Sequence, residues 1–458
     1  MHPIKKYLTN LFAKKRVLGD NPSLNGLVSA DTLLANLVEE KKVPGLAITV
    51  LKKGSVFFQK GYGFANREEG TRVNPETSVF RIASVSKPIA ATALAYMVNE
   101  KLIDLDAFFY TYVPYYPKKK YDFTIRQLAS HTAGIRGYRG IEYGLNKPYS
   151  IKESIGIFKD DELLFEPGTD YLYNSFDWVL ISLAMQEASG IAFEEYVEQK
   201  VLRPLRMDHT FWPVFNCAQS GLTDELGQTQ MAFEEEKETS VREQSSSDGN
   251  TGASVQAQSS SDGNTGASVQ AQSSSDGYSG ASVRAQSSSD GYSGASVRAQ
   301  SSSDGYSGAS VRAQSRTSDV VKFYSKNKIG FREAIPVDNF YKLAGGGFLS
   351  TTKDIAKFGQ AYLEGKVLNK ELRKEFLSAQ KVNGASVYYG LGWQVSEDAK
   401  GRPYFGHVGN GVGGYSNFFV YPEENMVFSI LTNCTDPKIQ SQLDTIIDLL
   451  ISADSPMG

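Results

Sequence analysis

The chain has 458 residues, a formal net charge of −3 and a hydrophobic fraction of 41%. This length leaves room for a large core, while the nearly balanced charge gives no electrostatic reason to expect nucleic acid or an anionic membrane as a partner. The four histidines show none of the spacings typical of catalytic zinc, so we expect no metal and no cofactor.

Residues 1–27 form a basic N-terminal tail that contains Lys5, Lys6, Lys14, Lys15 and Arg16. The tail lacks the apolar run of about 7 to 15 residues that marks a signal peptide. No segment reaches the roughly 20 apolar residues of a membrane span. We therefore expect a protein without a signal peptide or membrane span, cytoplasmic by default, and its compartment stays unassigned.

The pattern after Ser29 predicts an opening helix that ends near residues 42–45, where Pro and Gly interrupt it. Residues 46–51 and 55–59, joined by a Lys-Lys-Gly turn, are typical of a β-hairpin. Helical patterns then continue from residue 88 to about 205, broken by Pro- and Gly-containing turns.

The C-terminal part predicts a helix at 353–363 and a helix at 439–451, with strands between them at 388–395, 415–421 and 426–431. Strands at both ends with helices between them indicate an α/β fold, in which one antiparallel sheet is built from N- and C-terminal pieces and a mostly helical domain is inserted. We assign the folded domain to residues 28–218 and 338–453.

Residues 219–337 form an insertion that contains five copies of a 14-residue unit at 245–314. Each unit offers only Ala, Val and sometimes Tyr as apolar side chains. Burial of these few side chains would contribute too little to offset the entropy cost of ordering the backbone, about 1 to 2 kcal/mol per residue, so we expect the repeats to be disordered. The alternative is a short β-solenoid stacked through the Asp-Gly turns.

Ser84 and Lys87 form an S-x-x-K tetrad at the start of a long apolar segment. Three residues are almost one helical turn, so both side chains lie on one face and the amine can reach the hydroxyl. An amine can activate a serine only if its pKa falls from about 10.4, which predicts a partly desolvated pocket. Pro88 places Ser84 at or just before the helix start, beside free backbone N–H groups.

A second S-x-x-K tetrad spans Ser350 to Lys353 and precedes an amphipathic helix. A Ser or Thr at that place is most simply an N-cap, and we assign this copy no chemistry.

Two further residues are candidates for the same site. Tyr173 follows a Pro-Gly turn in a polar stretch, and a phenol can relay protons where a cation lies near it. His407 belongs to a Gly-rich strand edge at 406–411, where glycines permit close approach of a ligand. Taken alone, Tyr173 fits a buried aromatic side chain with one hydrogen bond better than a catalytic group, and His407 fits a structural histidine better than a ligand-binding one.

In the order Ser-x-x-Lys, Tyr and His-x-Gly, these residues resemble the serine β-lactamase and penicillin-binding superfamily, specifically its class C branch with esterases and D-amino-acid peptidases. Further landmarks of that branch follow in the expected order over residues 28–215 and 338–452. They lie at 80–84, 128–134, 202–207 and 345–350.

The resemblance implies a β-lactamase/transpeptidase-like fold and acyl transfer. Ser84 would attack an ester or amide carbonyl of a small molecule or peptide, while Lys87 and Tyr173 shuttle its proton. The backbone N–H groups of Ser84 and Asn410 would form the oxyanion hole. His407 and Gly409 would lie on the strand that lines the substrate pocket.

Two departures from the family pattern bear on the substrate. His407 stands where many relatives have Lys, which weakens the case for recognition of a β-lactam or carboxylate by a fixed cation. The usual Tyr-x-Asn is replaced by Tyr173-Asn174-Ser175, so Ser175 offers one hydrogen bond in place of an amide. We take His131, in the Ser-His-Thr landmark, as structural.

The sequence therefore predicts a serine hydrolase that cleaves an ester or amide through an acyl-enzyme. Two alternatives stay open. One is a penicillin-binding DD-peptidase or D-aminopeptidase, and the other is a catalytically silent binding scaffold.

Overall fold

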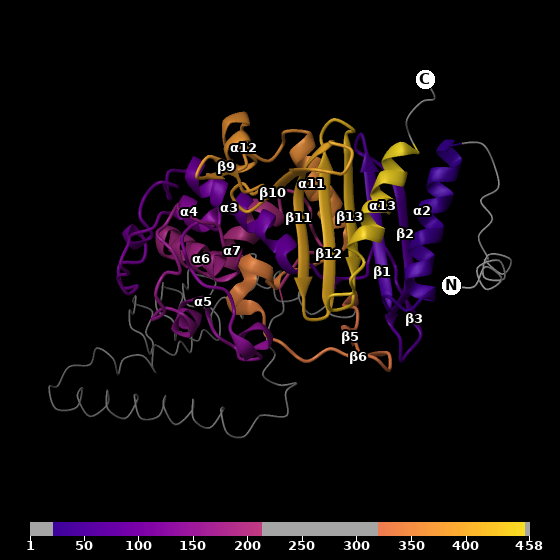
Figure 1. The fold of residues 1–458 in the computed structure, drawn as a ribbon, viewed down its shortest axis with the longest axis horizontal. Helices are drawn as coiled ribbons and strands as arrows, with labels where there is room; N and C mark the ends of the chain where they lie inside the picture. The colour runs from indigo at the N-terminus through magenta and orange to yellow at the C-terminus, as the bar shows by residue number, and fades with distance from the viewer. Residues whose placement is uncertain (1–21, 213–318, 454–458) are drawn as a thin grey trace, which may run out of the picture. The chain divides into compact units, whose positions relative to one another are not determined.

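The computed structural model describes residues 22–212 and 319–453, and these residues belong to one compact unit (Figure 1). The expected basic tail before residue 22 and the repeats at 245–314 lie outside the described residues.

A seven-stranded antiparallel sheet is built from both ends of the chain. The central contact joins β1 to β13, with Leu46 opposite Thr432. The prediction of one antiparallel sheet from N- and C-terminal pieces is confirmed. In spatial order the strands are β10 (Gln394–Glu397), β11 (Pro403–Gly411), β12 (Gly414–Tyr421), β13 (Met426–Thr432), β1 (Gly45–Lys52), β2 (Ser55–Asn66) and β3 (Thr71–Arg72).

Side chains alternate between the two faces of the sheet along each strand, so a strand that is apolar throughout needs cover on both faces. Helices cover both faces of this sheet. Phe428 and Ile430 of β13 pack with the two terminal helices, while Val427 and Leu431 face the other way into the larger core. Figure 1 shows the terminal helices together beside the sheet. The covering helices are α2 (Pro22–Glu39) and α13 (Gln440–Ser452) on one face and α3 (Ser86–Asn99) and α11 (Thr352–Leu363) on the other.

The helical part of the molecule surrounds α6 (Phe176–Ser189), whose first ten residues are all buried. A helix that is apolar all round belongs in a core. The remaining helices of the described residues are short: η1 (Ala83–Val85), η2 (Phe109–Thr111), α4 (Ile125–Ala129), η3 (Gly140–Gly144), α5 (Ile151–Ser154), η4 (Ile155–Ile157), α7 (Phe193–Val197), η5 (Glu198–Leu202), η9 (Phe340–Lys342), η10 (Leu343–Gly347) and α12 (Lys370–Phe376).

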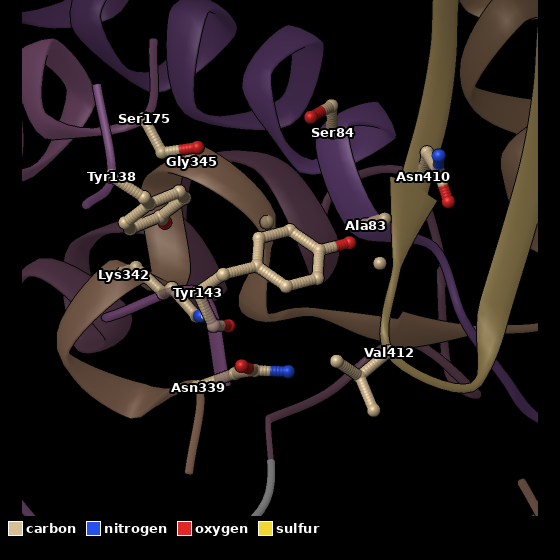
Figure 2. Close-up of a pocket in the computed structure, with 12 residues that line it drawn as sticks. Ala83, Ser84, Tyr138, Tyr143, Ser175, Asn339, Lys342, Gly345, Asn410 and Val412 are labelled. Carbon is tan, nitrogen blue, oxygen red and sulfur yellow. The ribbon is translucent and has the colours of Figure 1, made fainter. Parts of the chain in front are cut away.

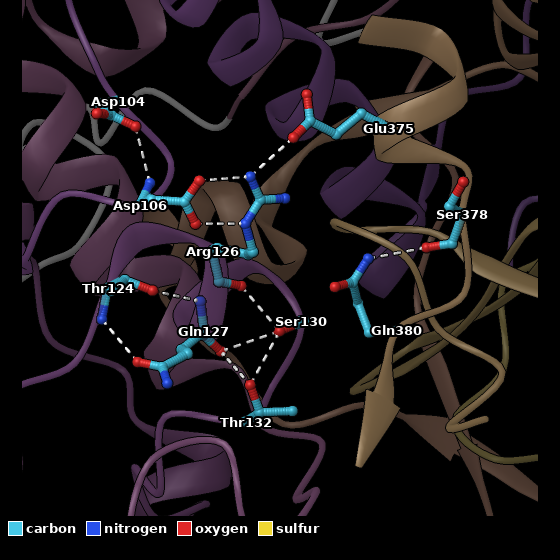
Figure 3. A network of polar contacts seen from close by, with 10 residues as sticks. All are labelled: Asp104, Asp106, Thr124, Arg126, Gln127, Ser130, Thr132, Glu375, Ser378 and Gln380. Atoms are coloured by element: carbon cyan, nitrogen blue, oxygen red, sulfur yellow. Dashed lines mark hydrogen bonds and ion pairs between the residues drawn. The ribbon is translucent and has the colours of Figure 1, made fainter. Parts of the chain in front are cut away.

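A polar network fixes α4 and the turn that follows it (Figure 3). Thr124 caps the helix by accepting from the backbone N–H of Gln127 at 3.2 Å. Arg126 binds both Asp106, at 2.6 Å, and Glu375 of α12, at 2.7 Å. The Ser130 hydroxyl donates to the carbonyl of Arg126 at 2.8 Å. The turn leading to His131 is thereby held against the body.

Residues 319–337, which the sequence analysis assigns to the insertion, pack against the folded body. The hairpin of β5 (Tyr324–Lys326) and β6 (Phe331–Glu333) begins at a tyrosine with no exposed surface. Its backbone N–H donates to the carbonyl of Asn433 at 2.9 Å, and Lys322 donates to Ala65 at 2.8 Å. At the other end, α2 begins at Pro22, inside the stretch assigned to the tail.

The expected strand at 388–395 is wrong over most of its length, since β10 begins only at Gln394. Gly392 has φ +82, and a Cβ there would meet Trp178 and Ala91 at 2.6 and 2.7 Å. The segment is therefore a loop pressed against the helical core. The expected N-cap before α11 is confirmed, and the capping residue is Thr351, which accepts from Asp354 N–H at 3.2 Å.

Two-stranded ladders complete the described part of the chain: β4 (Phe80–Arg81) with β7 (Leu349–Ser350), and β8 (Lys381–Val382) with β9 (Ala385–Ser386). The first of these ladders leads directly into the turn that carries Ser84.

Candidate active site

Ser84 lies in the tight turn η1, and α3 begins two residues later. Pro88 falls in the first turn of α3, as the sequence predicts. Ala83 has φ 45, a left-handed conformation that costs a residue with a Cβ about 1 to 2 kcal/mol. The side chain of Ser84 is only partly buried, so this strained turn presents its hydroxyl to the pocket.

Lys87 is completely buried and reaches back to Ser84. Its amine donates to Ser84 Oγ at 3.2 Å and to the carbonyl of Gly345 at 2.8 Å. Burial lowers the pKa of Lys87 to about 7, while the nearby Asp177 opposes this change. A sizeable fraction of the side chain is therefore a free amine at neutral pH, and a free amine can accept the proton of Ser84.

Tyr173 lies over the same pair, with its ring centroid 4.7 Å from Lys87 Nζ. The residue is 38% exposed. Burial around the hydroxyl nevertheless raises its pKa, and a hydrogen bond with Ser84 opposes that rise only in part. The hydroxyl consequently keeps its proton across the physiological pH range, which suits a proton donor and not a standing base.

Strand β11 runs directly beside Ser84, and Gly409 makes this approach possible. A Cβ at Gly409 would lie 2.3 Å from Ser416 Oγ, 2.4 Å from the carbonyl of Ile82 and 3.0 Å from the backbone nitrogen of Ser84. No side chain fits there. Asn410, the next residue along the strand, is exposed and lines the pocket.

His407 is buried beside Tyr173, with the two ring centroids 5.8 Å apart. The ring is 1% exposed and does not line the cavity that contains Ser84. Nδ1 lies 2.6 Å from the carbonyl of Val408, and Nε2 lies 3.0 Å from the hydroxyl of Tyr389. Burial, helped by the charge of Lys87, lowers the pKa of His407 to about 3. His407 is thus neutral at physiological pH.

Asn174 and Ser175 point to different places. The Asn174 amide is buried and donates to the carbonyls of Ile135 and Leu172, both at 3.1 Å, and to Asp177 Oδ2 at 2.7 Å. Ser175 lines the pocket at the start of α6. Of these two residues, only Ser175 can contact a substrate in the pocket.

His131 and Asp177 form a buried pair beneath Tyr173. Nδ1 of His131 lies 2.7 Å from Asp177 Oδ2, and its ring centroid is 4.6 Å from that of Tyr173. Burial lowers the pKa of His131 and raises that of Asp177. The expectation that His131 is structural agrees with these contacts. Asp177 escaped the sequence analysis, and its only signal was its place three residues after Asn174.

The pocket around Ser84 is a small cleft that opens to solvent (Figure 2). Three of the candidate residues line it: Ser84, Ser175 and Asn410. Four residues that the sequence did not indicate also line it: Tyr138, Tyr143, Asn339 and Lys342. Their signal was weak, because they belong to no motif. Lys342 does stand only three residues before the Gly345-Gly346-Gly347 landmark.

Within residues 22–212 and 319–453, no group of three or more histidine, cysteine, aspartate and glutamate side chains could hold a metal ion. In the same part of the chain no helix is long and apolar enough to cross a membrane.

Comparisons with known proteins agree with this architecture. A family model described as Beta-lactamase matches residues 30–451. Serine beta-lactamase-like protein LACTB, mitochondrial, from Homo sapiens is 24% identical over 493 residues, which cover 86% of this chain and 72% of that protein. Protein flp from Staphylococcus aureus (strain MW2) is 28% identical over 186 residues, and this match covers 39% of the chain but only 37% of that relative.

Among solved structures, D-amino acid amidase from Ochrobactrum anthropi SV3, complexed with L-phenylalanine amide, superimposes with a TM-score of 0.62 at 15% identity. The superposition covers 94% of this chain and 100% of the amidase. At that level of identity the likeness is evidence of a common fold.

Proposed function

Because the chain belongs to the Beta-lactamase family, we propose that it is a serine hydrolase that cleaves an ester or an amide through an acyl-enzyme on Ser84. The observation that carries this proposal is the buried amine of Lys87, which lies 3.2 Å from Ser84 Oγ and has its pKa lowered to about 7. A nucleophile within reach of a base that is deprotonated near neutral pH is the arrangement that acyl transfer needs.

The proposed reaction begins when Ser84 Oγ attacks the substrate carbonyl and its proton passes to the free amine of Lys87. The backbone N–H groups of Ser84 and Asn410 stabilise the oxyanion. The tetrahedral intermediate then collapses, and the leaving group departs with a proton from Tyr173, which Lys87 replaces. Water then attacks the carbonyl of the acyl-enzyme and passes a proton through Tyr173 to Lys87. Lys87 returns that proton to Ser84 Oγ as the bond to the acyl group breaks, and the acid is released. The opposite pKa shifts of Lys87 and Tyr173 support this division of roles.

The buried, neutral His407 bears on the alternative of a penicillin-binding peptidase, because that position offers no cation to a substrate carboxylate. The depressed pKa of Lys87 argues against a silent scaffold. Burying an amine is costly, and nothing about a binding surface requires it.

Intact-protein mass spectrometry after exposure to a fluorophosphonate, and separately to a penicillin, tests the proposal. We expect an adduct with the fluorophosphonate on the wild-type protein and none on Ser84→Ala. A stable adduct with both reagents would favour the penicillin-binding peptidase. A wild-type protein that reacts with neither reagent would favour the silent scaffold. An adduct that persists in Ser84→Ala would contradict the role given to Ser84.

A further inference from the structure

The pocket around Ser84 is lined by a second buried lysine, Lys342. Lys342 ends η9 and lines the same cleft as Ser84, together with Asn339 and Tyr143 (Figure 2). Only 8% of its surface is exposed. The catalytic scheme above gives this side chain no role, although a buried ammonium group is costly unless something pairs with it.

The contacts of Lys342 leave its ammonium group incompletely satisfied. Within the described residues its Nζ donates a long hydrogen bond, 3.3 Å, to the carbonyl of Tyr143. Three aromatic rings surround it, with the centroids of Tyr138, Tyr341 and Tyr143 at 5.2, 5.4 and 5.9 Å. An ammonium has three donors, so at least one remains for a ligand in the cleft.

The charges around Lys342 favour an anion. Burial and the positive charge of Arg81 lower the pKa of Lys342 to about 8, and Asp338 opposes them. The side chain is thus mostly charged at pH 7. Asp338 does not form an ion pair with it: one oxygen accepts from Phe340 N–H at 2.8 Å, and the other is buried without a partner. Burial also raises the pKa of Asp338.

We propose that Lys342 binds a carboxylate of the substrate whose carbonyl reacts with Ser84, so that the substrates are acidic esters or amides. This inference rests on the proposed function. It also differs from the sequence expectation about a fixed cation: His407 on the strand is neutral and does not line the cleft, and the cation comes from η9 instead. A single ammonium matches a singly charged carboxylate, whereas a phosphate dianion calls for more donors.

The rings of Tyr138 and Tyr143 supply the apolar part of this subsite. Both line the cleft with Lys342, and Asn339 adds an amide that can donate a further hydrogen bond. The hydrocarbon between the reacting carbonyl and the carboxylate would pack on these rings. The carboxylate can belong to the acyl group or to the leaving group, and substrate pairs distinguish the two.

The first test compares turnover of acidic and neutral esters. 4-Nitrophenyl hemisuccinate and 4-nitrophenyl butyrate differ by a carboxylate on the acyl side, and 4-acetoxybenzoate and its methyl ester differ by a carboxylate on the leaving side. We expect Lys342→Met to lower kcat/KM for one acidic ester by roughly tenfold to a hundredfold, mainly through KM, with its neutral partner within about twofold. Lys342→Arg, which keeps the charge, should retain part of the preference.

Lys147→Met, which removes an exposed positive charge, is the matched control and should leave all four esters unchanged. If Lys342→Met instead lowers turnover of acidic and neutral esters alike, together with the melting temperature, Lys342 only anchors the Tyr143 carbonyl and the inference is wrong.

The second test does not depend on catalysis. Calorimetry on the Ser84→Ala protein compares 4-phenylbutyrate with 4-phenylbutyramide, with and without Lys342→Met. We expect the carboxylate to bind about tenfold or more tightly than the amide, and Lys342→Met to remove the difference. Equal binding of the two ligands would overturn the role of Lys342. Preferential carboxylate binding in a protein whose wild-type form turns over none of the esters would support Lys342 and contradict the proposed function alone.

Discussion

Lys87 and Tyr173 occupy one site, and burial lowers the pKa of the lysine while it raises the pKa of the tyrosine. Burial disfavours the charged form of each group, so the lysine becomes a base near pH 7 and the tyrosine keeps its proton. The two residues therefore hold complementary protonation states before substrate arrives. In the proposed mechanism, their contacts with Ser84 let them act together in proton transfer.

This arrangement predicts the pH dependence of kcat/KM for an uncharged ester such as 4-nitrophenyl butyrate. Protonated Lys87 cannot accept the serine proton. The rate should therefore rise about tenfold per pH unit below pH 7 and level off above it. Tyr173 should cause no decline up to about pH 9, because its pKa is raised from its ordinary value near 10.

Stopped assays from pH 5 to 9, with Ser84→Ala as the background, check this profile. A neutral substrate keeps the titration of Lys342 out of the measurement. A flat rate between pH 5 and pH 8 would contradict Lys87 as the base.

Residue-level prediction from sequence succeeded where local geometry decides the outcome. Ser84 and Lys87 meet because three residues make almost one helical turn, whatever the rest of the chain does. His407 could not be judged in this way, because its burial depends on Tyr389, which comes from a separate loop. The positions of Asn174 and Ser175 could not be predicted either, because the sequence of two adjacent residues before a helix does not indicate which side chain is buried and which lines the pocket. Lys342 carries no motif at all.

At the scale of elements, the site depends on one close contact between strand β11 and the turn η1. Ser416 of β12 strengthens the same contact by donating to the carbonyl of Ile82 at 2.6 Å. The amphipathic helix α13 and strands β12 and β13 were predicted nearly to their ends, because their alternation or period is regular. The strand prediction for residues 388–395 was wrong over most of its length, because Gly392 has a positive φ and packs closely against Trp178 and Ala91.

This contact predicts a severe effect for Gly409→Ala. The added Cβ would clash with Ser416 Oγ, the Ile82 carbonyl and the Ser84 nitrogen. Because backbone atoms cannot step aside, we expect the free energy of unfolding to fall by roughly 1 to 3 kcal/mol, as for other overpacked sites, and fluorophosphonate labelling of Ser84 to slow at least tenfold.

Gly156→Ala is the matched control, because a Cβ there meets nothing within 4 Å. Denaturant unfolding and labelling rates measured on both variants check the prediction. Wild-type labelling by Gly409→Ala would mean that β11 does not position Ser84.

At the scale of the whole molecule, the described residues on either side of the insertion form the sheet, the two cores and the cleft by themselves. The sequence predicted the fold class and the order of its pieces. It misjudged where the chain returns to the folded domain, because residues 319–337 show little hydrophobic periodicity. They are held by backbone hydrogen bonds to distant segments and by buried side chains such as Val321 and Tyr324.

We expect deletion of residues 245–314 to leave both the melting temperature and the rate of ester hydrolysis nearly unchanged. Changing the length of a surface loop alters its closure entropy only slowly, by about 0.6 kcal/mol for each doubling. Calorimetry and steady-state kinetics on the deletion variant check this. A large drop in melting temperature would reveal that the repeats stabilise the enzyme.

The pairing of β1 with β13 joins two strands that are synthesised at different times during translation. During translation the ribosome releases Ser84 and Lys87 early, but the strands that complete their surroundings, β11 to β13, emerge more than three hundred residues later. Until then β1 has one unpaired edge, and the nucleophile has no wall beside it. Contacts so distant in sequence form slowly. We therefore expect the nascent chain to lack hydrolase activity, and to need protection from aggregation, until strands β11 to β13 have been synthesised and have joined the sheet.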